Sequence, residues 1–150
     1  MTFRLFTTLL HLGLLFLSGL PLSAAAEVRG TDVTGREVVL PEPARRIVLG
    51  DGRHLTVLGL LHDNPVALVA GWRQDKGLDP ATEAAYLARF PALAEVAAVG
   101  AGNRLLSVER TIALMPDLVV LSLIDARDPQ MAMPLQQLEA AGIPVAFVNF

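Results

Sequence analysis

The chain has 150 residues, with 12 lysines and arginines against 15 acidic residues and no cysteine. Its net charge of −3 comes without a basic run or basic–aromatic interleaving, so a nucleic-acid partner is not expected. The lack of cysteine excludes disulfides, thiolate metal sites and a cysteine nucleophile in this sequence.

The first 26 residues have the pattern of a secretion leader. Arg4 supplies a positive charge, residues 5–20 are mostly apolar, and small alanines precede Glu27. An uncleaved membrane anchor is the alternative, but the stretch is short for the roughly 20 apolar residues that a bilayer requires. We therefore expect a cleaved signal peptide over 1–26 and one exported domain over 27–150, with a net charge of −4.

Short apolar runs alternate with helical patterns through the rest of the chain. The expected elements are a hairpin turning at Thr34-Gly35, a strand at 46–49, a helix at 53–61, a strand at 66–70, a helix at 80–89, a helix at 108–115, a strand at 118–121, a helix at 129–141 and a strand at 145–148. The strands are apolar throughout, which is typical of a parallel sheet covered on both faces. The sequence therefore predicts an α/β fold, a doubly wound and mainly parallel sheet with flanking helices behind a short β-hairpin.

Candidate ligand-binding residues follow the first two predicted strands of this sheet. In open α/β sheets, ligands bind beyond the carboxyl ends of the strands. Asp51 and Arg53 follow one strand, and Trp72 and Arg73 follow the next. Two guanidiniums there would suit an anionic ligand, and the indole offers a flat apolar surface. The alternatives are solvated loop arginines and a tryptophan that covers the edge of the core.

The remaining polar candidates point to neither a metal site nor catalysis. His54 and His62 are eight residues apart, about 12 Å along one helix, so they cannot share a zinc ion. We interpret them as ordinary surface or helix-terminus histidines and predict no metal site and no cofactor. Asp125 and Asp128 lie after a strand, where two loop carboxylates are usually solvated.

Enzyme motifs are missing from the sequence. Gly50-Asp51-Gly52 lacks the further glycine of the dinucleotide fingerprint and the Gly-Lys-Ser/Thr of a phosphate loop. There is also no Gly-x-Ser-x-Gly elbow. The sequence therefore predicts a protein that is not an enzyme. An exported enzyme and a sensory module on a membrane anchor stay as alternatives.

Three stretches together resemble a known family. They are Asp32 to Val48, Ser107 to Val120 with its Leu-x-Pro-Asp segment, and Gly142 to Val148. Their order resembles the N-terminal lobe of the periplasmic substrate-binding proteins of ABC importers for ferric siderophores, haem and cobalamin. The resemblance implies a ligand held between two α/β lobes that one helix joins. This chain ends where that helix should begin, so we expect the N-terminal lobe alone, as a fragment or a truncated protein. A complete single-lobe protein is the alternative.

The resemblance also implies a function and a docking residue. Glu109 matches a surface glutamate that pairs with an arginine of the importer's membrane subunit. The alternative role for this acid is to complement the dipole of its helix, worth about 0.3–1 kcal/mol. We expect a monomeric periplasmic protein without a lipid-anchor cysteine, which captures a chelated iron complex, foremost a ferric siderophore. It would deliver this ligand to an ABC permease with its ATPase subunit, and haem or cobalamin is the alternative ligand.

Overall fold

A computed structural model of the chain describes residues 27–100 and 105–149. The predicted signal peptide lies outside the described residues. Among the described residues, no helix has the length and apolar character needed to cross a membrane.

The core of the fold is a parallel sheet of five strands. They are β3 (Ile47–Leu49), β4 (Val69–Trp72), β5 (Ala97–Ala98), β6 (Leu118–Ser122) and β7 (Val145–Val148). Their order in the sheet is β5-β4-β3-β6-β7, so β3 lies in the middle. The chain first adds strands on one side of β3 and then crosses to the other. The direction of winding therefore changes between β3 and β6, which is the usual place for a ligand in such folds.

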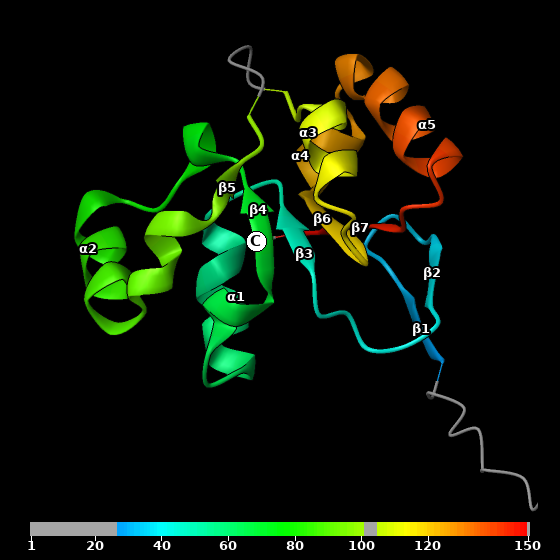
Figure 1. Cartoon of the computed structure of the whole chain (residues 1–150). Coiled ribbons are helices and arrows are strands. Elements are labelled where there is room, and N and C mark those ends of the chain that lie inside the picture. The colour runs from blue at the N-terminus through cyan, green and yellow to red at the C-terminus, as the bar shows by residue number, and fades with distance from the viewer. Residues whose placement is uncertain (1–26, 101–104, 150) are drawn as a thin grey trace, which may run out of the picture.

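Helices cover both faces of the sheet (Figure 1), as the sequence predicts. One group consists of α1 (Arg53–Leu61) and α2 (Pro80–Arg89), and the other of α3 (Val108–Ala113), α4 (Leu123–Ala126) and α5 (Ala132–Ala140). The core is correspondingly split in two. Leu49, Leu55 and Trp72 belong to the cluster under α1 and α2, whereas Val119, Leu138 and Phe147 belong to the cluster under α3 and α5. The predicted doubly wound α/β fold is confirmed.

Most element boundaries agree with the sequence, and the differences have local causes. Helix α2 spans the predicted residues because Asp79 accepts hydrogen bonds from two backbone N–H groups of its first turn. The strand expected at 66–70 has the wrong bounds: Pro65 opens a 3₁₀ turn over Pro65–Leu68, and β4 spans Val69–Trp72. Further 3₁₀ turns span Gln74–Lys76, Pro91–Glu95 and Pro129–Met131, and the last precedes a shortened α5.

The N-terminal hairpin lies against the outer edge of β7. Its strands are β1 (Val28–Thr31) and β2 (Glu37–Leu40), and Gly35 in the turn has a φ of 85°, which glycine adopts without strain. The Asp32 carboxylate accepts hydrogen bonds from Thr34 and Arg36 within the hairpin and from the Phe147 N–H at 3.2 Å. The Val33 N–H donates to the Phe147 carbonyl at 3.3 Å. The hairpin therefore covers backbone groups that an open sheet edge would expose.

A clamp at the amino ends of β3 and β6 joins two of the three family-like stretches. One Asp117 carboxylate oxygen accepts the backbone N–H groups of Arg45 and Arg46, each at 2.8 Å. In return, the Arg46 guanidinium donates to the carbonyl of Leu114 at 2.7 Å, at the end of α3. Because the two segments hold each other, the basic pair and the Leu-x-Pro-Asp segment act as one structural unit.

Replacing Asp117 with alanine is expected to destabilise the fold by about 1–3 kcal/mol, because two backbone donors lose their acceptor. Urea unfolding followed by circular dichroism measures this loss. The same change at the exposed Asp63 is the matched control and should alter stability by less than about 0.5 kcal/mol. Equal effects of the two changes would contradict the clamp.

Candidate functional site

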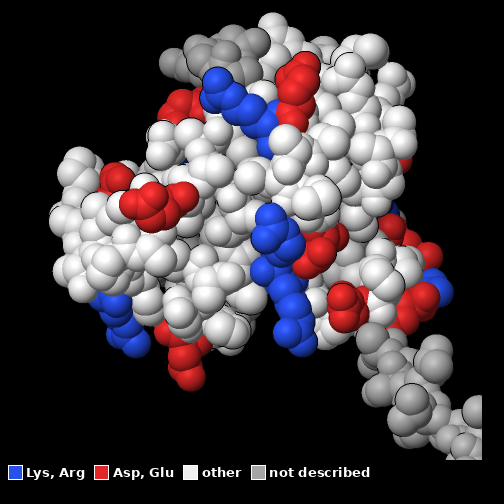
Figure 2. Space-filling view, in the orientation of Figure 1, with Lys and Arg blue, Asp and Glu red and all other residues white. Residues whose placement is uncertain are grey.

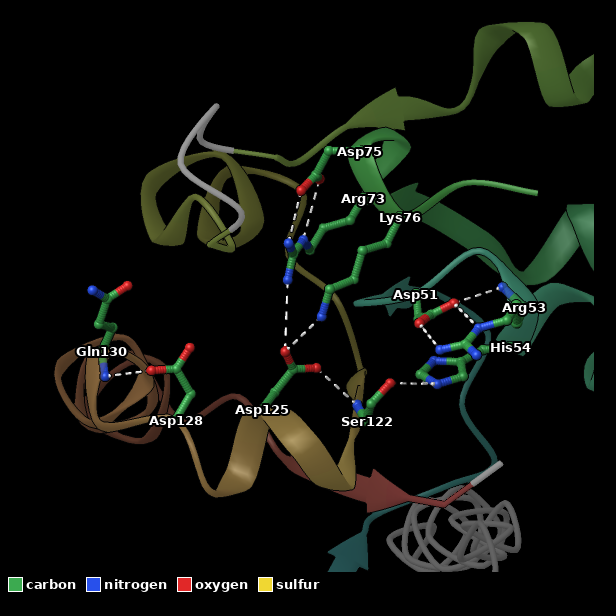
Figure 3. Close-up of polar contacts among 10 residues, drawn as sticks. All are labelled: Asp51, Arg53, His54, Arg73, Asp75, Lys76, Ser122, Asp125, Asp128 and Gln130. Carbon is green, nitrogen blue, oxygen red and sulfur yellow. Dashed lines mark hydrogen bonds and ion pairs between the residues drawn. The ribbon is translucent and has the colours of Figure 1, made fainter. Parts of the chain in front are cut away.

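Polar side chains from three neighbouring strands meet at the carboxyl edge of the sheet (Figure 3). Asp51, Arg53 and His54 follow β3, Ser122 and Asp125 follow β6, and Arg73, Asp75 and Lys76 follow β4. The group straddles the point between β3 and β6 where the direction of winding changes. It is therefore the candidate functional site.

Asp51 and Arg53 form an ion pair in which the carboxylate is buried and the guanidinium is exposed to solvent. The Asp51 side chain is 4% exposed, whereas that of Arg53 is 67% exposed. Nε and Nη2 of Arg53 donate to the two carboxylate oxygens at 3.0 and 2.6 Å. Burial by itself would raise the pKa of the Asp51 carboxyl, but the hydrogen bonds and charge of Arg53 outweigh it and lower that pKa. Asp51 thus holds an exposed guanidinium at the site.

Arg73 and Asp125 belong to a second, more deeply buried ionic group. The Arg73 side chain is fully buried and pairs with Asp75 at 2.8 Å and with Asp125 at 3.7 Å. Lys76 donates to the same Asp125 carboxylate at 3.0 Å, and the other oxygen accepts the Ser122 N–H. The pKa of Asp75 is lowered, chiefly by its hydrogen bond from Arg73. This group ties the segment after β4 to the start of α4.

Two of the predicted candidates are covered by protein in this structure. Arg73 is not a solvated loop residue, and Trp72 packs in the core beside Leu49 and Leu55 at 3% exposure. Of the four ligand-binding candidates, Arg53 alone has an exposed side chain, since Asp51 is also buried. Direct contact of Asp51, Trp72 and Arg73 with a ligand stays a prediction.

His54 links the ends of β3 and β6. Its Nε2 lies 3.3 Å from the Ser122 hydroxyl, and its side chain is buried. His54 lies in the first turn of α1, as the helix-terminus interpretation expects, but it is not on the surface, whereas His62 is exposed at the end of that helix. Burial lowers the pKa of His54, against a smaller opposing contribution from Asp51.

This burial predicts a pH dependence of stability. A histidine whose folded pKa lies below its ordinary value of 6.5 is more easily protonated in the unfolded chain. The free energy of unfolding should therefore be highest above pH 6.5 and fall as the pH drops below it, by at most about 1.4 kcal/mol per pH unit. Urea unfolding at pH 7, 6 and 5 tests this. His54→Gln should reduce the change of unfolding free energy with pH, and the control His62→Gln should not alter it. An unchanged pH dependence in His54→Gln would refute the assignment of this effect to His54.

Gly52 permits the close approach of the segments that follow β3 and β4. Its N–H donates to the Lys76 carbonyl at 2.6 Å. A Cβ at this position would lie 2.8 Å from the backbone carbon of Gly77, which cannot turn aside as a side chain would. Because position 52 has no side chain, the segment that carries Lys76 can lie close to it, in the position from which Lys76 contacts Asp125.

A shallow hollow opens at this edge beside Arg53. It has a volume of about 280 Å³ and is lined by Arg53, Ser122, Leu123, Ile124, Val148 and Asn149. A second hollow of about 260 Å³ lies between the C-terminal end of α1 and α2, beside Gly59, Tyr86 and Phe90. It contains none of the polar residues gathered at the carboxyl edge, so the hollow beside Arg53 is the better candidate.

Glu109 lies in the first turn of α3 and is exposed. Ser107 caps this helix by accepting the Arg110 N–H at 3.4 Å, and its hydroxyl donates to the Glu109 carboxylate at 3.3 Å. Because α3 runs back toward the start of β6, its first turn lies on the carboxyl side of the sheet, as Arg53 does. The docking role of Glu109 stays a prediction.

Charged side chains are mixed over the described face in Figure 2 and gather at no metal site among the described residues. Figure 2 shows acidic and basic residues in small mixed groups over the described part of one face, without a broad area of either sign. Among residues 27–100 and 105–149, no three histidines or carboxylates gather as a metal site. Asp128 is used locally, since it accepts the Gln130 N–H at the start of a 3₁₀ turn.

Several solved structures are similar to this chain and identify its fold. The TroA-like periplasmic binding protein FepB from Veillonella parvula matches 81% of the chain with a TM-score of 0.62 and 27% sequence identity. The chain has the fold of one lobe of the TroA-like periplasmic binding proteins. The haem-binding protein HmuT matches 84% of this chain with a TM-score of 0.53 and 25% identity. The molybdate-binding protein MolA of Haemophilus influenzae matches 81% with a TM-score of 0.58 and 21% identity, which shows the fold alone.

The lobe spans little more than a third of the length of these TroA-like proteins: 36% of FepB, 35% of HmuT and 34% of MolA. No protein-family model matches its sequence, and no curated protein sequence is significantly similar to it. The neighbours are binding proteins rather than enzymes, which agrees with the prediction from missing catalytic motifs. The predicted resemblance to this family is confirmed for the fold of one lobe, and the assignment to the N-terminal lobe stays a prediction.

Proposed function

We propose that this chain is the N-terminal lobe of the substrate-binding component of an ABC importer, acting outside the cytoplasmic membrane. The observation that carries this proposal is the match of nearly the whole described chain to one lobe of a TroA-like periplasmic binding protein. Its function is capture and delivery of a ligand. The 1–26 leader pattern, read as a cleaved signal peptide, supports a periplasmic location.

The proposed ligand is an anionic chelated iron complex, foremost a ferric siderophore, with haem or cobalamin as the alternative. Support comes from the exposed guanidinium of Arg53 at the carboxyl edge, where ligands of open α/β sheets bind. Asp51 would hold Arg53 in place, and Arg73 and Trp72 would shape the floor beneath the ligand. Glu109, on the same side of the sheet, would dock the loaded protein on the permease.

Tryptophan fluorescence tests the ligand. Trp72 is the only tryptophan in the sequence and lies directly before Arg73, so its emission reports on this edge. Ferric siderophores of the catecholate and hydroxamate kinds should quench it at micromolar concentration, because coloured iron complexes accept energy from an indole even without contact. Haemin and cobalamin are titrated in parallel, with iron-free siderophore as the control. A lack of quenching by all of these iron and corrin ligands would overturn the ligand proposal.

The intact mass of the native protein in a periplasmic extract tests the two-lobe arrangement. A mass about two to three times that of residues 27–150 is expected, because the matched region makes up only 36% of the length of FepB. A mass equal to residues 27–150 would contradict a two-lobed protein and direct the search toward a separate partner that completes the site.

A further inference from the structure

The hollow beside Arg53 combines one cationic group with an apolar wall. Ile124 is 69% exposed, so most of its side chain faces water at this hollow. Leu123 and Val148 line the same hollow, and Asn149 adds an amide at its rim. The apolar residues come from α4 and β7 and the guanidinium from the first residue of α1, so they meet only in the folded lobe.

The Arg53 guanidinium has one edge available for an anionic ligand at this hollow. Asp51 occupies Nε and one N–H of Nη2, which leaves the other edge of the guanidinium with no hydrogen-bond partner among the described residues. A planar fork held on one side by a buried carboxylate loses little freedom when a second carboxylate binds on the other. Because the Asp51 charge partly cancels that of Arg53, the pair suits a single negative charge on the ligand group that contacts it.

We infer that this hollow selects a ligand group in which a single negative charge is joined directly to a flat apolar ring, with Arg53 binding the charge and Ile124 covering the ring. This inference rests on the proposed function, which places the ligand at the carboxyl edge. It adds the chemistry of the recognised group and assigns Ile124 as a determinant of specificity.

Binding of small probes to the exported chain tests the inference by NMR. The probes are benzoate, which has both features, benzamide, which lacks the charge, and acetate, which lacks the ring. Benzoate should shift the Ile124 methyl and Arg53 Nε–H signals and bind at least about tenfold more tightly than benzamide or acetate, since a charge-assisted hydrogen bond and a buried ring each contribute roughly that factor. Equal binding of the three probes, or shifts confined to the hollow between α1 and α2, would overturn the inference.

Variants assign the roles of the two residues. Arg53→Gln should reduce benzoate affinity about tenfold and remove its preference over benzamide, whereas Ile124→Ser should weaken benzoate and benzamide alike. Arg45→Gln, an exposed arginine before β3, is the matched control and should change neither. The inference is overturned if Arg45→Gln and Arg53→Gln weaken benzoate equally.

Different experimental results would refute the inference and the proposed function. Benzoate binding at Arg53 and Ile124, together with no response of Trp72 to any iron or corrin ligand, would refute the iron ligand and keep the inference. Quenching by a ferric siderophore that is unchanged in Arg53→Gln and Ile124→Ser would refute the inference and keep the proposed function.

Discussion

Replacing Glu109 with arginine is expected to reduce ligand uptake by cells at least tenfold while ligand affinity changes by less than about twofold. The carboxylate is exposed in the first turn of α3 and contacts only Ser107 among the side chains of the described residues. An exposed charge of this kind steers docking and fixes orientation, and its reversal places like charges opposite each other on the proposed permease. The fold should tolerate the change, because the Ser107 cap remains and the helix-dipole loss is about 0.3–1 kcal/mol.

Uptake of the radiolabelled ligand and the dissociation constant of the isolated protein are the two measurements. Glu95→Arg is the matched control, because Glu95 is also exposed but lies at the end of a 3₁₀ turn that follows α2. It should leave uptake near the wild-type rate. A loss of affinity in Glu109→Arg would refute the docking role, and normal uptake would show that Glu109 merely complements its helix.

Replacing Asp125 with alanine is expected to destabilise the fold by about 3–5 kcal/mol, the largest effect of any single change considered. The carboxylate is buried and neutralises Arg73 and Lys76 together, so its removal leaves a fully buried guanidinium with less compensating charge. Ser122 also loses the acceptor of its N–H. Such a loss is a large part of the roughly 5–15 kcal/mol that separates folded from unfolded domains.

Urea unfolding of purified variants measures this effect. Asp128→Ala is the matched control from the same segment, since Asp128 only accepts the Gln130 N–H at the start of a turn. It should cost about 1 kcal/mol. If Asp125→Ala costs no more than Asp128→Ala, the buried ionic group does not stabilise the lobe, although Asp125 is buried and not solvated as the sequence suggests.

The fold could be predicted from sequence because its signals are local. The Asp79-Pro80 start of α2 and the continuous apolar run of β6 each depend on a few adjacent residues. Two failures show the limit. Strand β5 consists of Ala97-Ala98, which has no β signal of its own and pairs only because β4 lies beside it. The predicted bounds of β4 are wrong because Val66 to Ala70 is apolar throughout, whereas the 3₁₀ turn that Pro65 opens contains the first three of these residues.

The candidate site could be predicted only where its partners are near in sequence. Arg53 and Asp51 are two residues apart, and both were singled out. Lys76 and Asp125 are 49 residues apart, and no pattern in the sequence pairs them. The sequence nevertheless contains one indication of this pairing. Arg73 directly follows an apolar strand, and a charge that is buried there requires a partner of opposite charge. Asp125 follows β6, which lies two strands from β4 in the sheet, and it is therefore an acid that could pair with Arg73.

The hairpin also constrains the order in which the lobe can assemble. Asp32 and its partner Phe147 are 115 residues apart, and β7 is the last strand of the described chain. The hairpin can pair within itself as soon as β1 and β2 exist, but it has no place to dock until β7 has been made. Its docking on the sheet edge is therefore a late step in the folding of the described residues, because contacts between segments so far apart in sequence form slowly.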